Sequence, residues 1–207
     1  MAIRAVLTGD IVNSTKLGKV NEKKLLKTLQ QLLASHLFEF YRGDSFQVYV
    51  KEPKFALRIA LLCRAAAISI SQYEEIIFSD VRISIGIGQV TKPVRALGSA
   101  KGEAFVLSGR AFDEIAKTET RLSINTANSM ANEGLQVIAD YTNSIYKTMT
   151  SKQAEVIFQL LKGESQLAIA HKLKKTKSTI SQHASAGRWP EIEKLMHQYE
   201  NIINQLI

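Results

Sequence analysis

The sequence has a single cysteine, no long apolar run and no repetitive tract, and each absence excludes a class of protein. One cysteine, Cys63, rules out an intramolecular disulfide and a cysteine-rich zinc site, and its apolar neighbours predict a buried thiol. No apolar stretch approaches the roughly 18 residues that a membrane-spanning helix needs. The opening residues MAIRAVLTGDIVNST lack the pattern of a secretory signal. We therefore expect a cytoplasmic protein with no membrane partner.

What the sequence does contain is enough apolar material for a core and an excess of positive charge. Its 207 residues are 45% hydrophobic, which predicts a chain of two modest domains. The formal net charge of +8 favours an anionic partner. Residues 146–207 carry 9 Lys/Arg and 5 Asp/Glu, net +4, whereas residues 1–145 carry 18 and 14, also net +4. The last third is thus about twice as basic per residue, which favours nucleic acid as its partner.

Residues 151–188 predict three short helices, at 152–161, from 166 to 173, and from 177 onward. Between the second and third, residues 174–176 have the length of a helix-turn-helix corner. Thr176 can cap the third helix with its hydroxyl. In that third helix Ile180 is the only strong apolar anchor, and the other side chains are small, polar or basic. Such a surface suits entry into a DNA major groove.

The run LKKTKSTISQH, residues 173–183, resembles the helix-turn-helix of LuxR-type regulators and of sigma-factor region 4 without a gap. It departs from them at Lys174, where those families often have glycine. The resemblance implies binding of double-stranded DNA. The contacts it implies come from Thr176, Lys177, Ser178, Thr179, Ser181, Gln182 and Arg188, with Arg188 reaching phosphate. The residues alone leave a second interpretation open, a three-helix unit that binds protein.

Residues 1–124 predict a second kind of structure, in which strands and helices alternate. Strands are expected at 2–7, 37–41, 46–50, 81–88 and 121–124, and helices around 25–33, 53–72 and 104–117. The order β-α-β-β-α-β is the split-βαβ, or ferredoxin-like, arrangement of an α+β fold. In this topology Asp10, at the end of the first strand, and Asp44, at the tip of a hairpin, become neighbours. Two carboxylates there suit Mg²⁺, although each could also be an ordinary turn residue.

Three motifs in this half, GDIVNST (9–15), RGDSF (42–46) and VRISIGIG (81–88), resemble the class III nucleotidyl cyclase domain. This is the palm that diguanylate cyclases and many polymerases share. The chain is also similar to the SatD family, small proteins with this core and a GDIV-x-S opening. The resemblance implies Mg²⁺ held by Asp10 and Asp44, with help from the Ile11 carbonyl. It places Arg110 on the arginine that supports the transition state.

Two positions depart from the cyclase pattern. Val106 stands where an asparagine is expected, and Phe40 falls near the place of the purine-selecting lysine. Because charge that builds up on phosphorus needs donors, we expect nucleotide binding without efficient cyclisation. Lys101, in the basic loop before the helix, is a further candidate for phosphate binding. A solvated loop is an alternative for Lys101, as a surface ion pair is for Arg110.

Residues 125–150 predict a linker helix between the cyclase-like domain, 1–124, and a helix-turn-helix domain, 151–207. The final helix, from Pro190, carries one continuous apolar stripe. It either caps the helix-turn-helix core or forms the seam of a homodimer. The stripe consists of Ile192, Leu195, Met196, Tyr199, Ile202, Ile203 and Leu206.

The two halves together predict a transcriptional regulator that binds DNA and carries a degenerate cyclase-like sensor. The alternative is a Mg²⁺-dependent enzyme, a cyclase or phosphohydrolase acting on nucleotides, with a helical tail.

Overall fold

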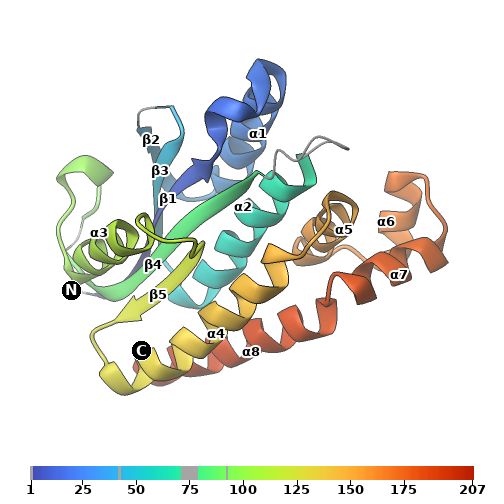
Figure 1. The fold of residues 1–207 in the computed structure, drawn as a ribbon. Coiled ribbons are helices and arrows are strands. Elements are labelled where there is room, and N and C mark those ends of the chain that lie inside the picture. Colours follow the sequence, from blue (N-terminus) through green and yellow to red (C-terminus); the bar gives the residue numbers. More distant parts are fainter. Residues whose placement is uncertain (1, 42, 71–78, 92) are drawn as a thin grey trace.

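A computed structural model describes residues 2–41, 43–70, 79–91 and 93–207. At its centre lies a five-stranded sheet in the order β2-β3-β1-β4-β5 (Figure 1). The first four strands pair antiparallel, and β5 joins β4 in parallel. The order β2-β3-β1-β4 is that of the predicted ferredoxin-like arrangement, so the expected α+β fold is confirmed. The strands are β1 Ala2–Val12, β2 Leu37–Tyr41, β3 Ser45–Val50, β4 Asp80–Val90 and β5 Leu122–Thr126.

Helices cover both faces of this sheet. One face of the central strands carries the buried apolar side chains of Leu7, Ile83 and Ile85, and on the other face Gly86 lets the backbone of a helix lie directly on the strand. The helices α1 (Gly18–Leu33) and α2 (Ala56–Ile70) pack on one face, and α3 (Glu103–Ile115) packs on the other, over β4, β1 and β5 (Figure 1). Three short 3₁₀ turns connect these elements: η1 Ser14–Lys16, η2 Pro53–Phe55 and η3 Leu97–Ser99. The helix predicted over 53–72 is thus divided into η2 and α2, and its last two residues lie outside the described ranges.

The C-terminal helices form a further layer, which packs on the outer side of α2. They are α4 Ser129–Lys147, α5 Ser151–Leu161, α6 Gln166–Leu173, α7 Lys177–Ala186 and α8 Trp189–Leu206. α5 packs on α2, while α8 lies along α4 and against η2 (Figure 1). Buried side chains from the sheet and from these helices belong to one continuous cluster, which extends from Ala5 to Ile203. The predicted linker, α4, is part of this packing, since Leu135, Ile138 and Ile145 are buried.

The apolar stripe of α8 is buried within the chain. Five of its seven residues are at most 5% exposed, namely Ile192, Leu195, Met196, Tyr199 and Ile203, and the other two pack against the same cluster. The stripe was predicted to cap the helix-turn-helix core or to form a dimer seam. It packs inside the chain, mainly on α4 and η2 and less on α7. The dimer seam predicted along it is wrong, because its side chains already contact α4, α2 and η2. A homodimer through another surface stays a prediction.

The expectation for the single cysteine is also met. Cys63 is fully buried in α2, and burial raises the pKa of its thiol to about 12. Within the described ranges, no helix combines the length and the apolar character needed to cross a bilayer.

Candidate functional site

Asp10 lies inside β1. The sequence had predicted that it stands at the end of the first strand. Asp10 pairs with Ser45 of β3 on one side and with Arg82 of β4 on the other. This pairing on both edges keeps the chain extended from Gly9 to Val12. A Cβ atom at Gly9 would lie 2.8 Å from the Arg82 carbonyl oxygen and from the Phe46 ring, so the strands approach this closely only because residue 9 is glycine.

Asp44 lies in the turn between β2 and β3, as predicted, directly before the residue that pairs with Asp10. Two hydrogen bonds hold this turn against the end of β1. The Ser14 hydroxyl donates to Oδ2 of Asp44 at 2.8 Å, and the Ile11 amide donates to the Asp44 carbonyl oxygen at 3.1 Å. The two aspartates therefore occupy adjacent strands at the same end of the sheet.

The negative charge and the hydrogen-bonding capacity of the Asp10 carboxylate are only partly satisfied by the residues around it. Nη1 of Arg82 lies 3.8 Å from Oδ2, whereas Oδ1 is buried and has no hydrogen-bond partner. Burial has the largest effect on the pKa of Asp10 and raises it. The positive charges of Arg82 and Arg121 lower this pKa and the negative charge of Asp44 raises it, and the net result is a raised pKa. Burial is thus the main cause of the rise, and the repulsion between the two carboxylates adds to it.

These groups fit a hard divalent cation. Mg²⁺ prefers oxygen ligands, and an orphaned, buried carboxylate oxygen is an acceptor that a cation would satisfy. Among the described residues, no three His, Cys, Asp or Glu side chains gather in one place. A cation here would depend on Asp10 and Asp44, completed by a main-chain oxygen such as the Ile11 carbonyl, by water or by phosphate.

The structure does not bring Lys101 to these carboxylates. The main chain at Lys101 and Gly102 bonds to the far end of β4, at Thr91 and Val90. Arg82, opposite Asp10, is thus separated from this point by a strand length of roughly 25 Å. Arg110 is exposed on α3, as is Val106, while the buried residues of that helix face the sheet.

Sequence reasoning missed the polar residues that surround Asp10 on the α3 face. Thr8 lies two residues before it and accepts a hydrogen bond from Gln47 at 3.2 Å. The Thr8 and Ser108 hydroxyls are 2.6 Å apart, and Ser84 donates to the Ser108 carbonyl oxygen at 2.6 Å. Period-two alternation in β1 and β4 was the available signal, since it puts Thr8 and Asp10 on one face, and Arg82 and Ser84 likewise.

Phe40 belongs to the opposite face of the sheet. Its ring lies 5.9 Å from that of Phe38 and 5.6 Å from that of Phe46, and all three pack with the core under α1 and α2. On the α3 face, the neighbouring strand position is Glu39, whose carboxylate accepts hydrogen bonds from the Tyr41 hydroxyl and the Leu97 amide. The Phe40 side chain, near the position where the resemblance places a purine-selecting lysine, therefore does not point toward Asp10.

The second candidate site is the pair α6 and α7. Lys174, between them, adopts a left-handed conformation with φ 53°, at the position where related turns often have glycine. The Thr176 hydroxyl accepts the Thr179 amide at 3.1 Å, which confirms the predicted N-cap. Ile180 is fully buried, as its role of sole strong anchor requires.

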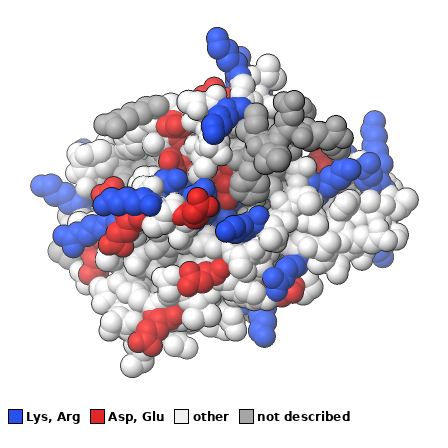
Figure 2. Space-filling model, viewed as in Figure 1, with Lys and Arg blue, Asp and Glu red and all other residues white. Residues whose placement is uncertain are grey.

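The outer face of α7 is polar and basic. Lys177, Ser178, Ser181 and Gln182 are all exposed, and they line an open groove of about 630 Å³ together with Gln166, Ser185 and Ala186. Residues 166–188 contain five Lys/Arg, at 172, 174, 175, 177 and 188, and no Asp or Glu. Lysine and arginine side chains project at this end of the molecule in Figure 2.

Arg188 differs from the other predicted DNA contacts. Its guanidinium lies 4.9 Å from the centre of the Tyr141 ring, donates to the Tyr141 hydroxyl, and pairs with Glu191 at 3.2 Å. The side chain thus joins the end of α7 to α4 and α8. Thr176 and Thr179 also use their hydroxyls internally, 2.9 Å from each other.

No protein-family model matches the sequence, and no curated protein matches it. Among solved structures, the chain is similar to a bacterial light-regulated adenylyl cyclase at 12% identity, over 59% of this chain and 74% of that one, with a TM-score of 0.41. It is also similar to the active GGEEF domain of a diguanylate cyclase from Vibrio cholerae at 12% identity, over 61% and 84%, again with a TM-score of 0.41. The α+β assignment rests on the strand order and connections described above.

Proposed function

We propose that this protein is a DNA-binding transcriptional regulator whose α7 enters the major groove and whose cyclase-like part binds a Mg²⁺–nucleotide complex. The observation that carries the DNA half is the exposed polar face of α7, in a helix-turn-helix segment that has five basic residues and no acidic ones.

The exposed residues of α7 divide by chemistry. Gln182 can form two hydrogen bonds with adenine, and Ser178 and Ser181 can bond to either base type, so these three read sequence. Lys174, Lys175 and Lys177 supply charge for phosphate contacts, which position the protein without reading bases. Arg188 we assign to holding α7 against α4, because its guanidinium is already engaged by Tyr141 and Glu191.

The DNA proposal is tested by selecting binding sites for the full chain from a pool of genomic fragments, followed by polarisation titrations at several salt concentrations. Gln182→Ala should relax sequence choice at one position, at a cost of about 1–3 kcal/mol. Lys177→Ala should weaken binding to all sequences and reduce the salt slope by about one. Lys194→Ala removes the same charge from the exposed face of α8 and should change neither. Absence of salt-sensitive binding to any fragment would refute the proposal.

For the nucleotide half, Asp10 and Asp44 would hold Mg²⁺, and Ser14 orients Asp44 through the 2.8 Å hydrogen bond. When bound, the ion supplies a positive charge that bridges to phosphate oxygens. The side chains of Thr8 and Gln47, which are hydrogen-bonded to each other at 3.2 Å, lie on the same face of the sheet as Asp10. Because Val106 offers no hydrogen-bond donor, we expect binding without efficient cyclisation.

An active nucleotide-processing enzyme is the second candidate, favoured by the orphaned Asp10 oxygen and the polar residues around it. Incubation of the protein with ATP or GTP and Mg²⁺, followed by chromatography of the nucleotides, separates the two functions. Cyclic or dephosphorylated product that disappears in Asp44→Asn supports the enzyme. Calorimetric binding without product supports the sensor.

A further inference from the structure

A cavity of about 680 Å³ lies where α8 crosses the start of α2 and the end of α5, away from both sites described above. Its volume falls within the range of small-molecule sites in proteins. Two of its lining side chains, Leu160 and Met196, are nearly buried and give it an apolar floor. Trp189, the only tryptophan of the chain, lines it as well.

Several polar side chains line this cavity, among them those of His197, Gln198 and Asn201 and the guanidinium of Arg58. The Nε atom of Arg58 is buried and has no hydrogen-bond partner. In the part of the chain that the structure describes, no carboxylate lies within 4 Å of the Arg58 nitrogens, although Glu193 and Glu200 line the same cavity. A buried donor in this state would be satisfied by an acceptor from a ligand, and a carboxylate gives the strongest such bond.

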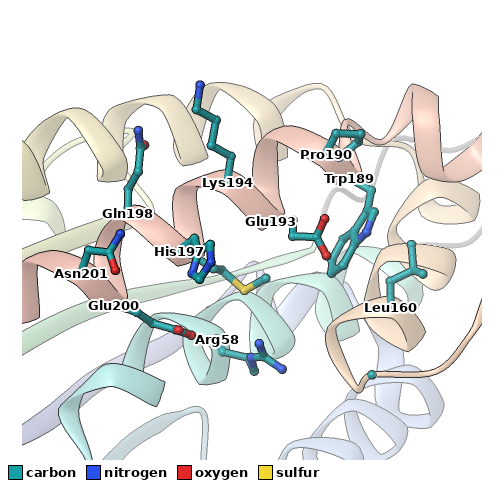
Figure 3. Close-up of a pocket in the computed structure, with 12 residues that line it drawn as sticks. Arg58, Leu160, Trp189, Pro190, Glu193, Lys194, His197, Gln198, Glu200 and Asn201 are labelled. Atoms are coloured by element: carbon teal, nitrogen blue, oxygen red, sulfur yellow. The ribbon is translucent and has the colours of Figure 1, made fainter. Parts of the chain in front are cut away.

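The opposite wall carries negative charge. Figure 3 shows the carboxylate of Glu193, the ring of Trp189 and the guanidinium of Arg58 directed into the same space. A simple anion would meet the repulsion of Glu193 and Glu200, and a simple cation would meet that of Arg58. A ligand with both charges avoids either cost.

We propose that this cavity binds a small zwitterion of the α-amino-acid type. Its carboxylate pairs with Arg58, its ammonium group pairs with Glu193, and its apolar side group packs on Trp189 and Leu160. The site lies between α2, α5 and α8. Ligand binding there does not depend on DNA or on nucleotide.

Trp189 reports on its own site, so intrinsic fluorescence of the full chain is the first measurement. The probes are L-phenylalanine and L-leucine, with 3-phenylpropionate, which lacks the ammonium group, and 2-phenylethylamine, which lacks the carboxylate. We expect a saturable change in emission with at least one amino acid. Each one-charge analogue should bind about tenfold more weakly or worse, since one lost charge-assisted hydrogen bond costs about 1.4 kcal/mol or more.

Variants test the assigned partners. Arg58→Met and Glu193→Gln should each weaken amino-acid binding about tenfold or more, with the emission change reduced accordingly. Glu155→Gln, which removes an exposed charge of α5 that does not line the cavity, should leave it unchanged. Far-UV circular dichroism checks that each variant is folded, and the exposed position of Glu193 keeps its variant informative if Arg58→Met does not fold. No saturable response to any amino acid, or equal binding of phenylalanine and 3-phenylpropionate, would overturn the proposal.

Discussion

The hydroxyl group of Tyr199 in α8 donates a 2.8 Å hydrogen bond to the carbonyl oxygen of Pro53 in η2, across 146 residues of sequence. Tyr199 is fully buried, and burial raises the pKa of its phenol. The C-terminal helix is thereby tied to the turn that leads into α2. This relationship makes α8 part of the core built on the sheet.

We expect Tyr199→Phe to lower the free energy of unfolding by about 0.5–1.5 kcal/mol. The hydrogen bond is lost, but the Pro53 carbonyl keeps its bond from the Ala56 amide, so the cost is that of one ordinary bond. Urea unfolding followed by circular dichroism and by Trp189 fluorescence measures it. The two signals should shift together. Tyr41→Phe, at an exposed position, is the matched control, and a shift confined to fluorescence would mean that α8 unfolds separately.

A buried ion pair fixes α2 to the first residue of β4. Nε and Nη2 of Arg64 donate to the two carboxylate oxygens of Asp80 at 3.1 and 2.7 Å, and both side chains are 1% exposed. Nη1 of Arg64 donates to Asn143 of α4, and the guanidinium lies 4.6 Å from the centre of the Tyr146 ring. One arginine therefore joins three elements of the fold.

Arg64→Met should destabilise the protein by about 3–5 kcal/mol, because it leaves the Asp80 charge buried and unpaired. Adding Asp80→Asn should restore part of that loss, since the uncompensated charge is then removed. Arg82→Met, at the longer, 3.8 Å ion pair with Asp10, whose side chains are 15% and 26% exposed, should cost about 1 kcal/mol or less. Chemical denaturation of the four proteins compares these values. If the double variant is no more stable than Arg64→Met, the loss arises from packing and not from charge.

The sequence predicted the kinds and order of elements well because local patterns determine them. Alternation of apolar residues marked β4, and the Thr176 hydroxyl marked the start of α7. The length of β1 was underestimated because Gly9 and Asp10 are poor strand formers, and only pairing with β3 and β4 keeps them extended.

What sequence could not predict is which surfaces meet. The stripe of α8 showed that one face is buried, but not that η2 and α4 cover it. Lys101 was predicted to bind phosphate and Asp10 to bind Mg²⁺ for a nucleotide, but pairing with β4 places them at opposite ends of the sheet. Arg188 was predicted to reach phosphate, but its guanidinium donates a hydrogen bond to Tyr141, which lies 47 residues earlier in the sequence.

Lys174 offers a test of the turn between α6 and α7. A residue with a side chain pays about 1 kcal/mol or more for its left-handed conformation, whereas glycine adopts it freely. Lys174→Gly should therefore raise the free energy of unfolding by about 0.5–1 kcal/mol. Lys174→Ala removes the same charge without that freedom and should change stability by less than about 0.5 kcal/mol. Thermal unfolding of both variants measures this, and a glycine variant less stable than the alanine variant would contradict it.

The raised pKa of Asp10 makes stability depend on pH in a defined direction. The folded state holds the carboxyl proton more tightly than the unfolded state does, so the protonated group favours folding. That contribution is present below the ordinary value of 3.8 and is lost as pH rises through the folded pKa. At pH 7 the ionised, partly buried carboxylate thus opposes folding unless a cation compensates it.

Asp10→Asn should accordingly be at least as stable as the wild type at pH 7 in the presence of a chelator, and its relative advantage should shrink toward pH 4. Addition of Mg²⁺ should reverse the order, because only the wild type has the charge that binds it, and a ligand at a hundred times its Kd adds about 2.7 kcal/mol. Asp113→Asn is the matched control, since it removes an exposed carboxylate of α3 outside the site, and its stability should increase with Mg²⁺ as that of the wild type does. Urea titrations at the two pH values, each with and without Mg²⁺, give all of these differences. Equal stabilisation of the wild type and Asp10→Asn by Mg²⁺ would mean that the ion binds elsewhere and that Asp10 serves only the strand pairing.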